Sequence, residues 1–383
     1  MRIKLKLDTT KTKGVFKYVS LGDVHLGHRQ NPTEDIIDNL NRLINDALLV
    51  EIDMLIITGD LFDRQLANGD DAVNAIHGWI TLLLYKCSKH NVMIRIVEGT
   101  PSHDRNQSIF FTEQKVNANI DVDLHYATEL SIVYEPKLDA HFLYVPDKWR
   151  PSTLTTLNEV KALLVQNDLE QVDFAIMHGA FSYQLPAIVP EPTHDEDAYL
   201  ELVKYHILIG HVHIMTIHER IFAAGSFDRI CQNDEIPKGM FYNTVKENGE
   251  YTSKFIENRK AKRFITLEVH SMSTKELFAY IKDTLVDLPP FSYIRLRCNP
   301  NDVAAGDINS FIVNYPNYFW DLTYEKVKPK RNSVNEIVEA FDMATMLAIE
   351  PTSILDLLDD ELDNHLIKGQ NKTKYLELFK SFI

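Results

Sequence analysis

The sequence predicts a layered α/β protein, and three observations support this prediction. Apolar runs of strand length alternate with stretches of helical spacing through about the first 120 residues. Five short motifs rich in histidine and aspartate each follow directly after an apolar run. Beyond them the chain shows a second strand–helix pattern and then a helical end. Open α/β sheets place their functional side chains at the carboxyl ends of their strands, so we expect the motifs to meet at one edge.

The expected strands of the motif-bearing part are short apolar runs. Those that precede motifs span Val15 to Leu21, Met54 to Thr58, Val92 to Val97, Phe174 to Met177 and Ile207 to Ile209. Others are expected from Asp121 to Tyr126, from Leu130 to Tyr134 and from His141 to Val145. Helical spacing predicts helices from Glu34 to Val50, from Asp70 to His90 and roughly from Thr155 to Asn167. Thr33 and Asp70 are candidate helix caps, and the proline-bearing stretch from Leu185 to Asp197 is expected to be a surface loop.

The sequence pattern in the remainder of the chain predicts a small module followed by helices. Strands are expected from Phe264 to His270, from Phe291 to Cys298 and from Tyr318 to Val327, with helices from Thr274 to Val286 and from Asp307 to Asn314 between them. Three further helices are expected from Val334 to Leu347, from Thr352 to Leu366 and from Lys374 to Phe382. The sequence therefore predicts a division into residues 1–253, a β-α-β-α-β module at 264–328 and a helical segment at 332–383.

Length, cysteine usage and charge limit the class of protein. A chain of 383 residues exceeds one ordinary domain, so two or three are expected. The three cysteines form no CxxC pair or disulfide framework, which favours a reducing compartment. No apolar run has the length of a signal peptide or a membrane span, so we expect a soluble cytoplasmic protein. The formal net charge of −15 argues against DNA binding by this chain alone. To bind DNA, the chain would need basic residues concentrated in one region, or a partner protein that contributes part of the binding surface.

The five motifs carry the residues that we expect to form the functional site. In chain order they are Gly22-Asp23-Val24-His25, Gly59-Asp60-Leu61-Phe62-Asp63, Gly99-Thr100-Pro101-Ser102-His103-Asp104, Met177-His178-Gly179 and Gly210-His211-Val212-His213. One such motif is weak evidence, because a lone histidine after a strand more often belongs to the core. Their order and their strand context together indicate one shared site. Carboxylates and imidazoles that converge from strand ends suit a pair of divalent cations.

This set resembles the calcineurin-like metallophosphoesterase superfamily, whose pattern is DxH, GDxxD, GNH[DE], H and GHxH. The resemblance implies a β-sandwich flanked by helices, and a pair of divalent metals that activates a water for in-line attack on phosphorus. It assigns Asp23, His25 and His213 to the first metal, His178 and His211 to the second metal, and Asp60 to the bridge between them. A carboxylate can bridge because it offers two oxygen atoms and a full charge.

The third motif departs from the superfamily pattern. The resemblance places His103 at the phosphate, where it stabilises or protonates the leaving oxygen, and it gives Asp104 the role of fixing the tautomer of His103. The asparagine that normally binds the second metal is absent. Ser102 is the expected substitute, although a hydroxyl is a poorer ligand than an amide oxygen. Asp63 is expected either to orient a metal ligand from behind or to be only a helix-start carboxylate.

The order of the elements narrows the resemblance. A phosphoesterase domain, a β-α-β-α-β module and terminal helices look like the SbcD family of DNA repair exonucleases, which includes subunits encoded by bacteriophages and working in the host cytoplasm. That likeness implies a capping domain beside DNA, and terminal helices that dock on an SbcC-type ATPase. It also implies two-fold dimers, Mn²⁺ as the metal with Mg²⁺ as the alternative, 3′ to 5′ exonuclease action on double-stranded ends, and nicking of single strands.

Two basic clusters flank the predicted capping domain. They comprise Lys254, Arg259, Lys260, Lys262 and Arg263, and then Lys326, Lys328, Lys330 and Arg331. We expect them to contact DNA phosphates; the alternative is that they are solvated linkers.

Two other functions stay open at this point. A cytosolic phosphoesterase of small phosphodiesters or phosphoproteins would share the motifs, but such enzymes rarely carry a capping module flanked by basic residues. A non-catalytic scaffold would share the fold, and only the missing asparagine favours it.

Overall fold

The computed structural model describes residues 14–29, 31–67, 69–147, 152–186, 192–230 and 236–324. By its internal contacts the chain divides into Met1–Tyr324 and Glu325–Ile383. The three terminal helices that the sequence predicts lie outside the described residues, as do Lys326, Lys328, Lys330 and Arg331. The predicted three-part division stays a prediction.

Six strands form the first sheet, in the order β13-β12-β1-β2-β3-β4. Their bounds are Val15–Leu21 for β1, Met54–Ile57 for β2, Met93–Val97 for β3, Leu124–Ala127 for β4, Gly239–Lys246 for β12 and Tyr251–Glu257 for β13. Strands β1 to β4 are parallel, whereas β12 runs antiparallel to β1 and to β13. The parallel strands bring their carboxyl ends to one edge of the sheet.

The second sheet has the order β10-β11-β9-β7-β6-β5, with β8 paired to β7. The bounds are Ser131–Glu135 for β5, Ala140–Val145 for β6, Val172–Phe181 for β7, Thr193–His194 for β8, Val203–His211 for β9, Thr216–His218 for β10 and Ile221–Ala223 for β11. Its central strands β6, β7 and β9 are parallel, and His178 on β7 pairs in register with Gly210 on β9. Two motif-bearing strands are therefore direct neighbours.

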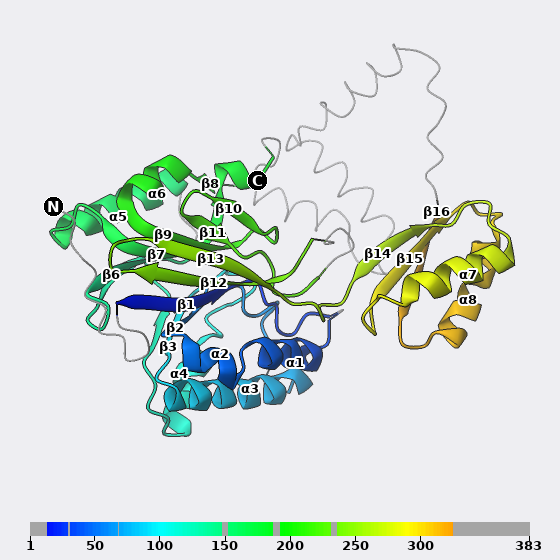
Figure 1. Ribbon diagram of the computed structural model, residues 1–383, viewed down its shortest axis with the longest axis horizontal. Helices are drawn as coiled ribbons and strands as arrows, with labels where there is room; N and C mark the ends of the chain where they lie inside the picture. The colour runs from blue at the N-terminus through cyan, green and yellow to red at the C-terminus, as the bar shows by residue number, and fades with distance from the viewer. Residues whose placement is uncertain are drawn as a thin grey trace, which may run out of the picture. The chain divides into compact units, whose positions relative to one another are not determined.

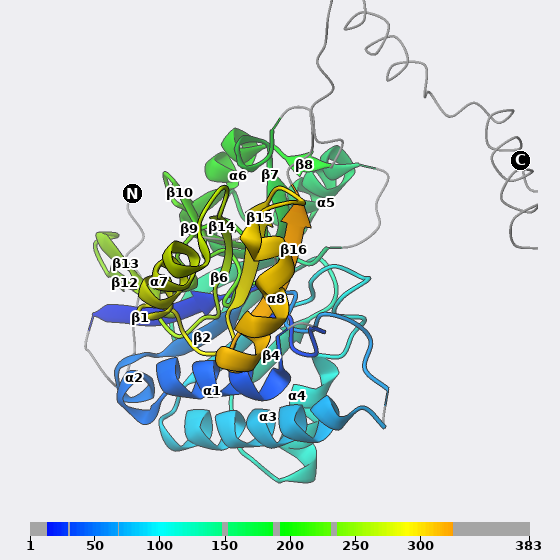
Figure 2. The same ribbon diagram turned by 90° about the vertical axis from the view of Figure 1, so that its right-hand side faces the viewer.

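Helices cover the outer faces of the two sheets (Figure 1). On the six-stranded sheet they are α1 (Thr33–Leu43), α2 (Asp46–Glu51), α3 (Asp71–Lys89) and α4 (Ile109–Asn117). On the other sheet they are α5 (Thr153–Gln166) and α6 (Glu196–Leu202), and a short 3₁₀ turn, η1, spans Ser182–Gln184. Helices α1 and α3 lie side by side (Figures 1 and 2).

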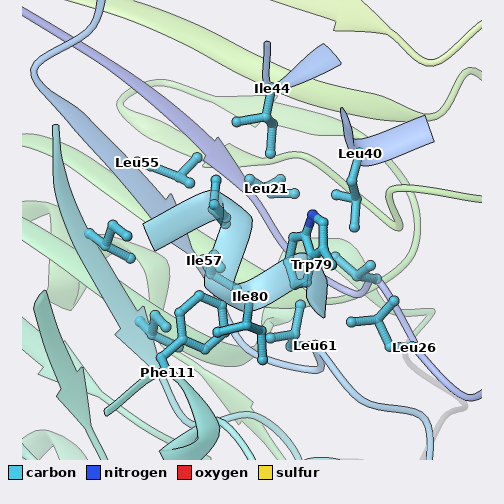
Figure 3. Close-up of a cluster of buried hydrophobic side chains, with 14 of the residues drawn as sticks. Leu21, Leu26, Leu40, Ile44, Leu55, Ile57, Leu61, Trp79, Ile80 and Phe111 are labelled. Carbon is cyan, nitrogen blue, oxygen red and sulfur yellow. The ribbon is translucent and has the colours of Figure 1, made fainter. Parts of the chain in front are cut away.

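Side chains of the parallel strands alternate between two cores, because both faces of the first sheet are buried. On one face, Tyr18 and Ile56 pack against Phe174 of the second sheet, which forms the interior of a sandwich. On the other face, Ile57 packs against Ile80 of α3 (Figure 3). A third core joins the second sheet to α5 and α6. This helix–sheet–sheet–helix order confirms the predicted layered α/β fold, which is metallophosphoesterase-like.

Local chemistry explains where the elements differ from the prediction. The predicted helix from Glu34 to Val50 is two helices, because Asn45 adopts an extended backbone and its side chain accepts a hydrogen bond from the Leu48 amide. Thr33 is not a cap, since its hydroxyl accepts from the Gly27 amide instead. Asp70 does cap α3, as predicted. The stretch predicted as a loop from Leu185 to Asp197 contains β8 and the start of α6.

The small module has the predicted β-α-β-α-β order. Its elements are β14 (Phe264–Glu268), α7 (Thr274–Leu285), β15 (Tyr293–Cys298), α8 (Val303–Asn314) and β16 (Phe319–Tyr324). The three strands are parallel, and both helices pack on one face of their sheet around Leu296 and Phe311 (Figure 1). Among the described helices, none has the combination of length and apolar character that a membrane crossing needs.

Candidate metal centre

Six residues from the motifs gather in two groups at the carboxyl ends of the parallel strands. The first group is Asp23, His25 and His213, and the second is Asp60, His178 and His211; within each group the potential ligand atoms lie within 4.8 Å of one another. In the first group the Nε2 atoms of His25 and His213 are 3.2 Å apart. In the second, Nε2 of His178 lies 3.3 Å from Oδ2 of Asp60. This grouping is the one that the sequence resemblance implies.

Four of these residues have a left-handed backbone conformation, which residues other than glycine rarely adopt. The φ angles are 50° for Asp23, 54° for His25, 48° for Asp60 and 107° for His211. Such conformations cost about 1–3 kcal/mol each and persist where the surroundings enforce them. Here the backbones are held together, because the Asp23 amide donates to the Gly59 carbonyl at 3.0 Å and the His25 amide donates to the Asp60 carbonyl at 3.1 Å. Strain concentrated at converging carboxylates and imidazoles points to a functional site.

Two glycines make room for the second group. A Cβ atom at Gly59, whose φ is +85°, would lie 2.4 Å from Nδ1 of His178. A Cβ atom at Gly99 would lie 2.1 Å from the Asp60 amide nitrogen. Neither position tolerates a side chain, because the neighbours are backbone or a buried ring. The glycines of the second and third motifs are therefore required by packing around the candidate ligands.

Contacts at Nδ1 orient two of the histidines: a hydrogen bond for His178 and an ion-pair contact for His25. Nδ1 of His178 lies 2.6 Å from the Thr58 carbonyl, so it carries the proton and leaves the Nε2 lone pair to the second group. Nδ1 of His25 lies 3.3 Å from Oδ1 of Asp63, which leaves its Nε2 to the first group. His25, Asp63 and His103 are also close enough to hold an ion. Because Nδ1 of both His25 and His103 already faces an oxygen atom of Asp63, we assign Asp63 the orienting role.

The charges of the site fit divalent cations. Burial raises the pKa of the Asp23 carboxyl. Burial would also raise the pKa of Asp60, but His178 and His25 hold it well below its usual range. Burial alone would lower the pKa of His178, yet the Asp60 carboxylate raises it to about 10. Among the described residues, no lysine or arginine forms an ion pair with Asp23 or Asp60. Two buried carboxylates with imidazole as their counter-charge suit borderline cations, which would displace the imidazole proton.

Thr100 occupies the place that we predicted for Ser102. The Thr100 hydroxyl lies 3.1 Å from Oδ2 of Asp60, 3.2 Å from Nε2 of His178 and 3.3 Å from Nδ1 of His211. Its amide also donates to Oδ1 of Asp60 at 2.6 Å. Ser102 has no such contact among the described hydrogen bonds and lines a neighbouring pocket. Thr100 is therefore the stronger candidate for this place, because it follows Gly99 directly at the end of β3, and the assignment of Ser102 stays a prediction.

The structure corrects the role of Asp104. Its carboxylate is fully buried and accepts hydrogen bonds from the amides of Phe62 and Gly99, at 2.9 Å and 2.8 Å. Nδ1 of His103 instead lies 2.6 Å from the Asp63 carbonyl oxygen. The backbone at Asp63 therefore fixes the tautomer of His103, and Asp104 ties the second motif to the third.

Lys238 is a site residue that the sequence analysis missed. Its side chain is 1% exposed, and its ammonium donates to the His213 carbonyl oxygen at 2.8 Å. Burial, together with the neighbouring positive charges of His25 and Lys238, lowers the pKa of His213 to about 3 and so keeps its imidazole neutral. No sequence signal marks this residue, because lysines are normally exposed.

The structure describes five of the residues that were predicted to contact DNA, and they differ in their exposure to solvent. Lys254, Arg259 and Lys260 are exposed. Arg263 is half-buried. Lys262 is buried, and its ammonium lies 2.6 Å from Oδ2 of Asp35 on α1. The expectation for Lys262 is therefore corrected, because a buried and paired ammonium cannot reach a phosphate.

No family model matches the chain, and no curated protein matches it. Among solved structures, it is similar to that of TT1561 of Thermus thermophilus, with 9% identity, a TM-score of 0.37, and coverage of 63% of this chain and 99% of that chain. It is also similar to nuclease MPE of Pseudomonas putida, with 19% identity, a TM-score of 0.24, and coverage of 54% of this chain and 66% of that chain. At these TM-scores neither likeness supports a conclusion, so the assignment of function rests on the geometry of the site.

Proposed function

We propose that this chain is a metal-dependent phosphodiesterase that cuts DNA. One observation carries the proposal: two groups of carboxylate and imidazole donors meet at one sheet edge, with His103 beside them. Asp60 belongs to the second group, and its charge also acts on Asp23 and His25 of the first group, which supports a bridging role. When bound there, two divalent cations supply Lewis acidity and lower the pKa of water toward neutrality.

The protein side chains have separable tasks in this proposal. The six grouped residues hold the cations, and Asp63 orients His25 from behind. The ring of His103 meets that of His25 edge-on, with centroids 5.0 Å apart. Since Nδ1 of His103 is engaged by the Asp63 carbonyl, its Nε2 is the atom that can donate a proton to the leaving oxygen.

DNA is proposed as the substrate because three exposed basic residues precede the module in the chain. Lys254 lies on β13, and Arg259 and Lys260 lie in the connection to β14; all three are exposed. This supports phosphate contacts by an otherwise acidic chain. On the basis of the sequence resemblance, we further propose that the chain is the nuclease subunit of an SbcC–SbcD-like complex in DNA repair, recombination or replication. It would be a cytoplasmic dimer that uses Mn²⁺ and works with an ATPase partner.

A cleavage assay tests this function. Wild-type protein and Asp60→Asn are incubated with Mn²⁺ or Mg²⁺ on end-labelled duplex DNA, single-stranded DNA and a chromogenic phosphodiester. We expect the wild type to cleave DNA and Asp60→Asn to leave it uncut. Hydrolysis of the chromogenic ester alone would favour a small-molecule phosphoesterase. Equal cleavage by wild type and variant would show that the activity comes from a contaminant or another site.

A further inference from the structure

A pocket of about 260 Å³ opens beside the second ligand group. Thr100, His178 and His211 form the wall that it shares with the candidate metal centre. Its other walls are made by Pro101, Ser102, Pro146, Asp147, Ser152, Thr153, Thr156, Gly179, Ala180, Pro192 and His194. A ligand bound at the candidate metal centre can therefore extend into this space.

The shared wall fixes what the occupant is attached to. A phosphodiester that is held by the two ligand groups carries two ester substituents, and a substituent on the side of His178 and His211 enters the pocket. The volume is at the small end of the range for ligand sites, which is about 300–1,000 Å³. A space of this size suits one small group, such as a single nucleoside.

The described lining suits a substituent with flat apolar faces and polar edges. Pro101, Pro146 and Pro192 give rigid apolar surface that loses little side-chain entropy when a ligand binds. The described lining residues include no lysine or arginine, and the carboxylate is that of Asp147. A nucleobase with its sugar has the required mixture of flat faces and hydrogen-bonding edges.

Thr156 offers a polar group to a ligand in this pocket. It lies in the first turns of α5 and is 5% exposed. Its neighbours are already engaged: the Ser152 hydroxyl accepts from the Thr155 amide at 3.2 Å, and the Thr153 hydroxyl donates to the Thr193 carbonyl at 2.7 Å. A hydroxyl that lines the pocket offers a bound ligand both a donor and an acceptor.

We propose that this pocket binds the nucleoside on one side of the scissile phosphate, which rests on the proposed phosphodiesterase function. The nucleoside must be unpaired to enter, because an enzyme pocket of this kind takes a base only after it has left the stack. The pocket therefore gives the metal centre a preference for nucleotide esters over simple phosphodiesters. It also gives a preference for frayed or single-stranded DNA over paired ends.

Matched chromogenic esters test the proposal. Hydrolysis of methyl p-nitrophenyl phosphate is compared with that of the p-nitrophenyl phosphates of thymidine at the 5′ and 3′ oxygens, with Mn²⁺. In the wild type, one thymidine ester should exceed the methyl ester in kcat/KM by at least about tenfold, as for other filled specificity pockets. Thr156→Met, which fills the pocket, should reduce that ratio toward one. Thr156→Val should keep most of it, and Leu154→Met, at a 62% exposed position on the same helix, should keep all of it.

The outcomes distinguish a failure of this inference from a failure of the proposed phosphodiesterase function on which it rests. Hydrolysis of the methyl ester with no advantage for either thymidine ester in the wild type overturns the nucleoside pocket and leaves the phosphodiesterase standing. An advantage that survives undiminished in Thr156→Met also overturns it. No hydrolysis of any ester or of DNA overturns the proposed function and this inference with it.

Discussion

The hydroxyl of Thr100 lies 3.2 Å from Nε2 of His178, in the motif where the pattern that the sequence resembles carries an asparagine. The same hydroxyl contacts Asp60 and His211, so one neutral oxygen touches every member of the second group. A hydroxyl is a weaker ligand than an amide oxygen, and this group is therefore expected to bind its cation less tightly than the first group.

Substitution of Thr100 tests this relationship. Thr100→Asn restores the amide of the superfamily pattern and should tighten the weaker of two cation-binding steps. Thr100→Val should loosen that step by about tenfold or more, as when other supporting groups at metal sites are lost. Ser102→Ala, two residues away, should leave it unchanged. Calorimetric titration with Mn²⁺ measures the affinity of this step in all three variants. A weaker step in Ser102→Ala together with an unchanged step in Thr100→Val would contradict the assignment.

His103 should act in the reaction and not in metal binding. Its Nδ1 faces the Asp63 carbonyl, so Nε2 is free for the leaving oxygen. His103→Ala should therefore keep both cations and lose about 10²-fold or more in rate, as for other general acids. Metal content and kcat are measured on the same preparation. Loss of a cation together with the rate would make His103 a ligand and the assignment wrong.

Neutralisation of the exposed cations should weaken the grip on DNA. The triple variant Lys254→Gln, Arg259→Gln and Lys260→Gln should bind DNA less tightly, and the slope of log affinity against log salt should fall by about one for each lost contact. Lys262→Gln is the matched control: its charge is paired with Asp35, so it should lower stability and leave the salt slope alone. Unchanged binding by the triple variant would show that these residues are solvated linkers.

A buried histidine in the sandwich core makes the fold sensitive to acid. Tyr18 donates to Nδ1 of His206, and burial, aided by Arg220, lowers the pKa of His206 from 6.5 to about 3. Below pH 6.5 the unfolded chain takes up a proton that the folded chain refuses. Stability therefore falls by up to about 1.4 kcal/mol per pH unit. His206→Gln keeps an acceptor for Tyr18 and should lose less Tm on acidification. The same acid sensitivity in both proteins would refute this cause.

The parts of the site that follow from strand ends could be predicted from the sequence. Asp23, Asp60 and His178 are each placed by a buried apolar strand, and a continuous apolar run is a strong local signal. The path of the chain after β3 could not be predicted, because the turn from Thr100 to Asp104 is set by contacts with Asp60 and with the backbone of Asp63. The sequence alone gives no reason to prefer Thr100 over Ser102.

The same limit applies to residues whose role depends on burial. Lys262 and Lys254 belong to one basic run in the sequence, yet the first is buried against α1 and the second is exposed on β13. Lys238 lies far along the chain from His213, and only the packing of the fold brings its ammonium to that carbonyl. Tertiary contacts of this kind leave no periodic trace in the sequence.

The central claim is a two-cation centre with Asp60 between the cations, and anomalous scattering from crystals grown with Mn²⁺ tests it most directly. The wild type should show two peaks, one among Asp23, His25 and His213 and one among Asp60, His178 and His211. In Asp60→Asn at least the second peak should be lost, because a neutral amide cannot bridge two cations. Two full peaks in Asp60→Asn, or none at these residues in the wild type, would contradict the claim.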